Sequence, residues 1–193
     1  MLTELRITGF GGQGVIRFGY LLGKAASIYD GKQATMTQSF GPEARGSACS
    51  SQVVISDDRV LYPYVTVPHV VVAMSQEGFV KHAENIREGG TLVIDEDLVK
   101  PEKAIKGVKL FAIPSTRFAE EMGIKIVANI VMFGFFTAVT GLVKEESAKK
   151  AIEASFREKL VDLNLKAFDK GYQYGKEQLS KKAGAKSQAR ASR

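Results

Sequence analysis

The sequence predicts an α/β fold: a single three-layer domain with a mostly parallel sheet, an antiparallel edge and a helical C-terminal part. Over the first 115 residues, short apolar segments alternate with amphipathic ones, as in strands joined by crossover helices. From Thr116 onward the spacing of apolar residues is helical only. The chain has 193 residues, 45% of them hydrophobic and 25% charged, which is enough to bury one core.

A strand, a glycine turn and a helix open the chain. Apolar residues frame a strand between Leu2 and Phe10, and the turn Gly9-Phe-Gly-Gly-Gln-Gly14 overlaps its end. Between Val15 and Ala25 the apolar residues recur at helical spacing. This layout aims free backbone N–H groups and the positive end of a helix at whatever lies above the turn.

The later elements follow from periodicity and from the positions of Gly and Pro. Strands are expected at residues 33–38, 48–56, 69–74, 91–95 and 108–113, and residues 60–65 are expected to continue an antiparallel hairpin that turns at 57–58. Helices are expected after the capping residue Ser75 and at residues 117–122, 128–141, 144–156 and 164–179.

One apolar segment has nearly the length of a membrane span. Residues 126–143 carry no charge, whereas a spanning helix needs about 20 residues and aromatic anchors at its ends. Asn129 and Gly134 interrupt the segment, and no Trp or Tyr flanks it. We therefore expect a buried helix and no membrane association. Its phenylalanines lie on both faces, which indicates burial all round, and a partner subunit could provide part of that burial.

The formal charge of +6 is concentrated at the C-terminus. Residues 180–193 carry five basic and no acidic side chains, and the remaining chain carries 22 basic and 21 acidic ones. The body is therefore near neutral, which argues against a nucleic-acid-binding surface. We expect residues 180–193 to form a disordered basic tail outside a domain that covers residues 1–179.

Cysteine and histidine usage limits the kinds of site that the chain can build. Cys49 is the only cysteine, so the chain forms no internal disulfide and cannot hold an iron–sulfur cluster on thiolates. This usage fits a reducing cytoplasm, and the first residues lack the apolar core of a signal peptide. His69 and His82 have no acidic or thiol neighbours at ligand spacing, so we expect no metal site.

The glycine turn leaves three interpretations open. Gly9, Gly11 and Gly14 match the dinucleotide-binding fingerprint, but the acid that should end the second strand is missing, because Asp30 precedes that strand. The turn could instead bind another anionic coenzyme, through Gly11, Gly12, Gln13 and Gly14. In the third interpretation the glycines only allow close packing against a neighbouring backbone.

A second loop, at residues 40–47, is expected beside the glycine turn. Glu43 and Arg45 stand two residues apart on a frame of Pro and Gly. They could form a surface ion pair worth about 0–1 kcal/mol, or offer their charges to a partner protein or an anionic ligand. We take Phe40, Pro42, Glu43 and Arg45 as interface candidates, and Arg45 also as a coenzyme contact.

Together these two motifs closely resemble the gamma subunit, or gamma domain, of the 2-oxoacid:ferredoxin oxidoreductases. The resemblance runs from about residue 4 to about residue 175 and leaves only the basic tail outside. The second motif looks like the 2-oxoglutarate branch of that family. The residues that carry the resemblance are Gly9-Phe-Gly-Gly-Gln-Gly-Val15, Thr37-Gln-Ser-Phe-Gly-Pro-Glu-Ala-Arg-Gly-Ser47, Ser75-Gln-Glu77, Asn129, Gly134, Asn164, Ala167, Phe168 and Gly171.

The resemblance implies a subunit of a multi-subunit enzyme that decarboxylates a 2-oxoacid oxidatively to its acyl-coenzyme A and reduces ferredoxin. Thiamine diphosphate and iron–sulfur clusters would reside on partner subunits of the alpha, beta and delta types. No residue of this chain is expected to be catalytic, and the chain alone is expected to be inactive. Its two loops would help to form the coenzyme A channel or would only contact other subunits.

The substrate and one rival function stay open at this point. The resemblance favours 2-oxoglutarate, with pyruvate, branched-chain oxoacids and indolepyruvate as alternatives. The rival from another class is a stand-alone dinucleotide- or coenzyme-binding protein that uses the same glycine turn.

Overall fold

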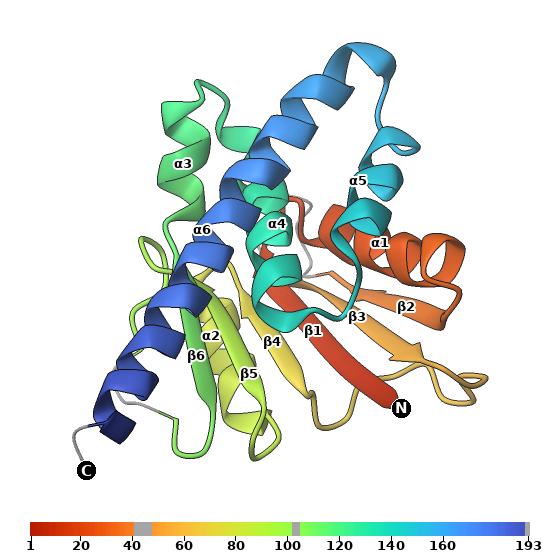
Figure 1. Cartoon of the computed structure of the whole chain (residues 1–193). Coiled ribbons are helices and arrows are strands. Elements are labelled where there is room, and N and C mark those ends of the chain that lie inside the picture. Colours follow the sequence, from red (N-terminus) through yellow and green to blue (C-terminus); the bar gives the residue numbers. More distant parts are fainter. Residues whose placement is uncertain (41–47, 102–104, 192–193) are drawn as a thin grey trace.

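A six-stranded mixed sheet separates two unequal layers of helices in the computed structural model (Figure 1). The structure describes residues 1–40, 48–101 and 105–191, with side chains as far as Gly184. Its strands are β1 (Leu2–Phe10), β2 (Gln33–Ser39), β3 (Ala48–Ser56), β4 (Val70–Ala73), β5 (Thr91–Asp95) and β6 (Lys109–Ile113). Its α-helices are α1 (Val15–Lys24), α2 (Gln76–His82), α3 (Ser115–Glu121), α4 (Ala128–Thr140), α5 (Glu145–Glu153) and α6 (Glu158–Ala191).

The strand order is β2-β3-β1-β4-β5-β6. β1, β4, β5 and β6 run parallel, and β3 lies antiparallel between β1 and the edge strand β2. The predicted fold class, a mostly parallel sheet with an antiparallel edge, is thus confirmed. The expected strand at residues 60–65 is wrong, because this segment forms no strand. Its expected partner β3 is already paired with β1 on one side and β2 on the other, and Pro63 lacks the N–H group that a ladder needs.

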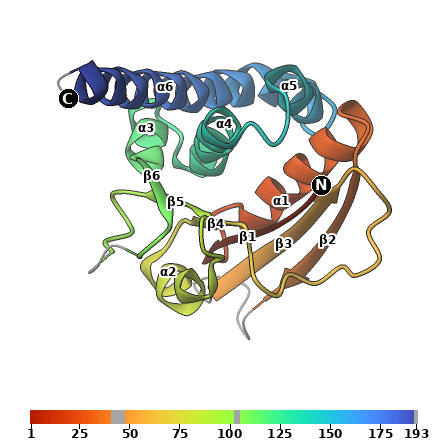
Figure 2. The same cartoon turned by 60° about the horizontal axis from the view of Figure 1, so that its bottom comes forward.

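Helices cover the two faces of the sheet unequally. α1, α3, α4, α5 and α6 lie on one face, whereas α2 lies on the other with the connection between β3 and β4 (Figure 2). On the first face, Leu5 and Ile7 of β1 are fully buried in the main hydrophobic core. On the second face, a smaller core joins Phe79 of α2 to Val71 and Leu92 of the neighbouring strands.

The apolar helix α4 is buried on every side by the chain itself. Phe133, Phe135 and Phe136 are each 0% exposed, so the expected contribution of a partner subunit to their burial is not needed. α4 crosses α6 at glycines, because a Cβ atom on Gly134 would overlap the carbonyl oxygen of Phe168, and one on Gly171 would overlap that of Val131. Among the described helices, none combines the length and the apolar character needed to cross a membrane.

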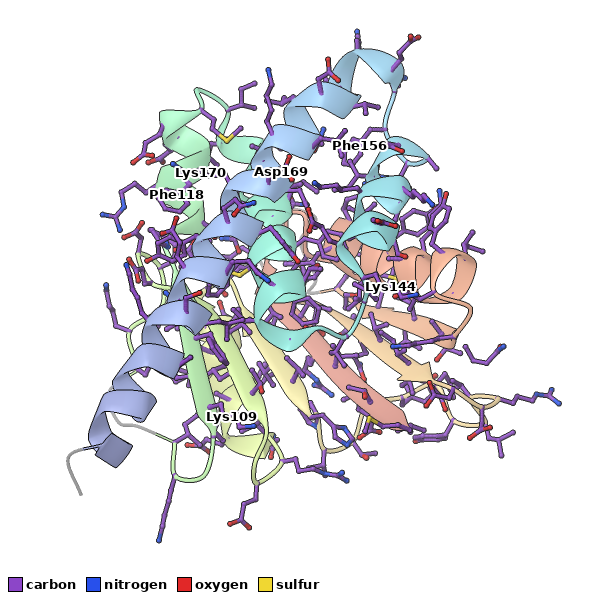
Figure 3. The ribbon with its side chains drawn as sticks, viewed as in Figure 1. Lys109, Phe118, Lys144, Phe156, Asp169 and Lys170 are labelled. Atoms are coloured by element: carbon purple, nitrogen blue, oxygen red, sulfur yellow. The ribbon has the colours of Figure 1, made fainter. Side chains whose placement is uncertain are left out.

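α6 continues through most of the expected tail, as far as Ala191. Its side chains fix it along the domain, beginning with the ammonium of Lys170, which lies 4.6 Å from the centroid of the Phe118 ring (Figure 3). Further on, Gln178 Nε2 donates to the carbonyl oxygen of Ala112 at 2.8 Å, and Lys182 Nζ donates to that of Leu110 at 3.1 Å. In the structure, the backbone of the expected tail continues α6 from residue 180 to Ala191. The segment is rich in Ala, Lys, Gln and Arg, which favour helix, and it contains no proline.

A buried carboxylate fixes the start of α3. Asp95 is 0% exposed at the end of β5, and its Oδ2 accepts hydrogen bonds from Ser115 Oγ at 2.5 Å, Thr116 N at 2.9 Å and Thr116 Oγ1 at 2.7 Å. Its other oxygen accepts from Asp97 N at 3.0 Å. One side chain thus satisfies four donors and ties α3 to the sheet.

We expect Asp95→Ala to lower the free energy of unfolding by about 2–4 kcal/mol, because buried donors would lose their acceptor. Urea denaturation followed by circular dichroism measures the change. Asp97→Ala removes an exposed carboxylate two residues away and serves as the control, with an expected loss below about 1 kcal/mol. Equal losses for the two variants would contradict the assigned role of Asp95.

A half-buried histidine on the second face makes stability depend on pH. His82 Nδ1 lies 3.0 Å from Arg6 Nη1, and burial, together with the charges of Arg6 and Lys81, lowers the pKa of His82 to about 4. The folded state therefore favours neutral His82. The stability that this provides is fully present above the unfolded pKa of about 6.5 and is lost as pH falls towards 4.

We expect His82→Gln to remove part of this acid sensitivity, because the amide stays neutral and its oxygen can still accept from Arg6. The measurement is the urea midpoint of both proteins at about pH 7 and about pH 5. The wild-type midpoint should fall more than that of the variant. An equal fall in both would show that other groups carry the acid sensitivity.

Candidate functional site

The glycine turn between β1 and α1 is held by the side chain of Gln13. Gln13 Oε1 accepts from Phe10 N at 2.7 Å, and Gln13 Nε2 donates to the carbonyl oxygen of Met74 at 2.8 Å. The amide therefore ties the turn to the end of β4. The turn also needs left-handed backbone at Gly12, with φ 100°, and at Gly14, with φ 73°. The structure thus gives Gln13 a positioning role, since both ends of its amide are bonded within the chain.

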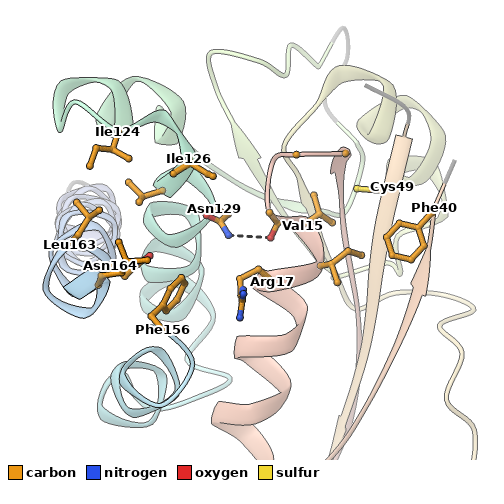
Figure 4. Close-up of a pocket in the computed structure, with 16 residues that line it drawn as sticks. Val15, Arg17, Phe40, Cys49, Ile124, Ile126, Asn129, Phe156, Leu163 and Asn164 are labelled. Atoms are coloured by element: carbon orange, nitrogen blue, oxygen red, sulfur yellow. Dashed lines mark hydrogen bonds between the residues drawn. The ribbon is translucent and has the colours of Figure 1, made fainter. Parts of the chain in front are cut away.

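The start of α4 contacts the glycine turn and holds it in place. Asn129 is 4% exposed, and its Nδ2 donates to the carbonyl oxygen of Gly14 at 3.2 Å (Figure 4). A Cβ atom on Gly14 would overlap this amide. Gly14 is the N-cap residue of α1, whose first turn contains no acidic side chain. The helix start therefore remains favourable for an anion.

A cavity of about 540 Å³ opens between the turn and the helical layer. Figure 4 shows α4 and the start of α6 on one side of it and the turn with α1 on the other. The lining is predominantly aliphatic and aromatic. Its residues are Gly11, Gly12, Gly14, Val15, Ile16, Arg17, Phe40, Cys49, Ile124, Ile126, Val127, Asn129, Phe156, Leu160, Leu163 and Asn164.

Among the described residues, few polar groups line this cavity, and none of them is acidic. The Arg17 guanidinium is exposed and lies 5.2 Å from the centroid of the Phe156 ring. Asn164 is 4% exposed and donates from Nδ2 to the carbonyl oxygen of Leu160 at 2.7 Å. Burial raises the pKa of the Cys49 thiol, which favours its neutral form. The cavity thus suits a mainly neutral ligand that carries an anionic group near Arg17 and the start of α1.

The mouth of the cavity presents exposed apolar side chains. Phe40 at the end of β2 is 67% exposed, and Ile126 before α4 is 76% exposed. Leu160 and Ile124 are also exposed there. Large apolar side chains that gather beside a cavity are typical of a surface that another protein covers.

The structure brings together only part of the predicted site. Gly11, Gly12 and Gly14 line the cavity with Phe40. The predicted contacts Pro42, Glu43 and Arg45 lie outside the described residues. Asn129 and Asn164 join the site without having been predicted there, because nothing in their local sequence shows that they meet a turn more than a hundred positions away. Arg17 also joins it, against the ring of Phe156, which the turn motif does not show. Among the described residues, no group of three or more His, Cys, Asp or Glu side chains could hold a metal ion.

The strand order separates this site from a dinucleotide-binding fold. β3 lies between β1 and β2, so the end of β2 is one strand further from the glycine turn than the ribose-binding acid of a dinucleotide fold. β2 itself ends in Gln38 and Ser39. The fold and the site therefore define a class of α/β domains in which a clamped glycine turn faces a cavity closed by C-terminal helices.

Comparisons with known proteins agree with this class. A family model described as pyruvate ferredoxin/flavodoxin oxidoreductase matches residues 4–174. The chain belongs to this oxidoreductase family. A relative, the 2-oxoglutarate synthase subunit KorC of Methanocaldococcus jannaschii, is 48% identical over 179 residues, which cover 92% of this chain and 96% of the relative.

Solved structures point to the same subunit. The gamma subunit of the keto/oxoacid ferredoxin oxidoreductase from Geobacter sulfurreducens PCA is similar with a TM-score of 0.78 and 42% identity, over 90% of this chain and 98% of that chain. The 2-oxoglutarate:ferredoxin oxidoreductase from Magnetococcus marinus, with 2-oxoglutarate, coenzyme A and succinyl-CoA bound, gives a TM-score of 0.83 and 25% identity, over 91% of this chain and 31% of that chain. The predicted resemblance to the gamma subunit is confirmed.

Proposed function

We propose that this chain is the gamma subunit of an enzyme that oxidises 2-oxoglutarate, forms succinyl-CoA and passes electrons to ferredoxin. The observation that carries this proposal is the match, over nearly the whole of both chains, to a 2-oxoglutarate synthase subunit. The Magnetococcus marinus structure with 2-oxoglutarate and succinyl-CoA bound supports the same substrate. The strand order differs from that of dinucleotide-binding folds, so it does not support the rival function, a stand-alone dinucleotide-binding protein.

Within that enzyme, we assign to this chain one wall of the coenzyme A path. The pyrophosphate of coenzyme A would lie at the start of α1, near Arg17. The pantetheine arm is an uncharged chain with two amide groups, which suits a cavity that combines aliphatic walls with the amides of Asn129 and Asn164. Arg45 remains a proposed further contact, with Phe40, Pro42 and Glu43 at a subunit interface.

The remaining cofactors are assigned to partner subunits. The single cysteine of the chain, Cys49, is buried in β3, so its residues do not fit an iron–sulfur cluster. The sequence also lacks the Gly-Asp-Gly motif of thiamine diphosphate sites. We therefore propose alpha, beta and delta-type partner subunits that hold these groups, a cytoplasmic location, and a family-type domain that covers residues 1–179.

We expect Arg17→Gln, in the enzyme assembled from all its subunits, to raise the KM for coenzyme A about tenfold, which corresponds to about 1.4 kcal/mol. The KM for 2-oxoglutarate should stay the same, because this chain is not expected to contact the oxoacid. The measurement is anaerobic reduction of a viologen acceptor at varied coenzyme A concentration. Arg59→Gln, an exposed arginine far from the cavity, serves as the control.

The exposed side chains of Phe40 and Ile126 favour an alternative role for this surface, in which it contacts another subunit and does not bind coenzyme A. In that case Arg17→Gln would leave the KM for coenzyme A unchanged, and Ile126→Asp would weaken co-purification with the partner subunits. This outcome would reject the coenzyme A contact and leave membership of the complex intact.

A further inference from the structure

Two asparagines lie on the helical wall of the cavity, Asn129 at the start of α4 and Asn164 in α6 (Figure 4). Each is 4% exposed, and each donates from Nδ2 to a backbone carbonyl oxygen, Asn129 to that of Gly14 at 3.2 Å and Asn164 to that of Leu160 at 2.7 Å. A carbonyl oxygen can only accept a hydrogen bond, so the NH2 group of each amide has to face it. The orientation of both amides is therefore fixed, and each amide oxygen is left for another donor.

The two amide oxygens have no donor within the described part of the chain, where each of these asparagines is bonded only through Nδ2. Neither Oδ1 atom is sealed inside the protein without a partner, as Ser51 Oγ is, so both keep contact with solvent. Since both residues line the cavity, this contact is with the cavity. An acceptor fixed in a mainly apolar cavity loses part of its hydration, which a ligand that donates a hydrogen bond replaces.

Donors and acceptors lie on opposite sides of the cavity. On the side of the glycine turn, Arg17 and the start of α1 offer donors to an anion. On the other side, the oxygens of Asn129 and Asn164 are surrounded by aliphatic and aromatic side chains. A complementary ligand therefore joins an anionic group to an uncharged chain that carries N–H or O–H groups. A fatty acid has no such groups along its chain and would leave both oxygens unpaired.

We propose that Asn129 and Asn164 accept hydrogen bonds from the two amide N–H groups of the pantetheine arm, and so select coenzyme A over thiols whose arm lacks these groups. The inference rests on the proposed coenzyme A path and adds to it the groups of the coenzyme that this chain recognises. Both asparagines are then specificity-determining residues, which contact the arm and take no part in the bonds that form or break.

Asn129 links this recognition to the glycine turn. When its oxygen accepts from the ligand, the same amide donates to the carbonyl oxygen of Gly14, and two hydrogen bonds in series strengthen one another. Asn164 makes the same kind of link to Leu160, whose side chain is 38% exposed at the mouth of the cavity. Binding of the arm therefore stabilises both the turn and the start of α6.

The test uses the enzyme assembled from all its subunits and two analogues of coenzyme A, in each of which an ester oxygen replaces one amide N–H of the pantetheine arm. Each analogue keeps the thiol, the phosphates and the length of the arm but has one donor fewer. We expect the wild-type enzyme to use each analogue with a kcat/KM about tenfold below that of coenzyme A, because a fixed acceptor then stays unpaired. The measurement is anaerobic viologen reduction with 2-oxoglutarate.

Variants of the two asparagines assign the effect to this chain. Asn129→Ala and Asn164→Ala should lower kcat/KM for coenzyme A, and each should abolish the discrimination against one of the two analogues. Alanine favours helix at both positions, and if Asn129→Ala does not fold, Asn164→Ala alone carries the test. Leu163→Ala removes a side chain from the same wall without removing an acceptor. It is the matched control and should keep the discrimination against both analogues.

Two results would overturn the proposal. Equal use of coenzyme A and both analogues by the wild-type enzyme would show that the amide N–H groups are not recognised, and the coenzyme A path would still stand if Arg17→Gln raises the KM for coenzyme A. Discrimination that survives both asparagine substitutions would place the recognition on another subunit. If Arg17→Gln is then also without effect, the proposed path fails together with this inference.

Discussion

Gly171→Ala is expected to destabilise the fold strongly, with a loss of about 3–5 kcal/mol in the free energy of unfolding. The added methyl group would overlap the carbonyl oxygen of Val131 on α4, which is backbone and cannot rotate away. α4 and α6 would have to separate along a crossing that buries Phe133 and Phe168 completely. Gly134→Ala should have a loss of similar size, because it meets the carbonyl oxygen of Phe168 from the other helix.

A matched control lies on the same helix. A Cβ atom on Gly184 would meet none of the described atoms within 4 Å, so Gly184→Ala should raise stability by about 0.5–1 kcal/mol through helix propensity. Urea denaturation followed by circular dichroism gives both values. If Gly171→Ala proved as stable as the wild type, the close approach of α4 and α6 would have to be abandoned.

Gly14→Ala is expected to have the second largest effect, because it damages both the fold and the site. The substitution forces a side chain into left-handed backbone at φ 73° and into the amide of Asn129. We expect a loss of about 2–4 kcal/mol in the free energy of unfolding, and at least a tenfold rise in the KM for coenzyme A in the assembled enzyme. Thermal denaturation and the viologen assay measure the two effects.

Two further variants separate the causes. Gly12→Ala also occupies left-handed backbone, at φ 100°, but meets no atom of the described residues within 4 Å, so it should show the backbone effect alone. Asn129→Ala makes room for the new methyl group, and the double variant with Gly14→Ala should therefore be more stable than the sum of the single losses predicts. Strict additivity would mean that the two residues do not interact.

Local patterns predicted most elements because most of them are locally determined. The strand before the glycine turn and the fully apolar helix around Phe133 have the expected periodicity and lie where it places them. The segment at residues 60–65 also alternates like a strand. It forms none, because β3, its expected hairpin partner, already lies between β1 and β2, and that occupancy is a property of the whole sheet.

The charge of the C-terminal segment suggested a tail separate from the domain. Its helix propensity instead continues α6 to Ala191, and Lys182 contacts β6. The site was predictable only at the glycine turn, where spacing within one motif carries the information. Asn129 and Arg17 became part of it through the packing of α4 against α1, which no short pattern encodes.

The order of α4 and α6 along the chain has a consequence for biosynthesis. α4 leaves the ribosome before the residues of α6 that cover it, and at about 5–20 residues per second this gap lasts on the order of seconds. During that time α4, which carries large apolar side chains on every face, is not yet buried by α6. We therefore expect the nascent protein to be a client of chaperones until α6 has left the ribosome and covered α4, and to become competent for assembly only after that step.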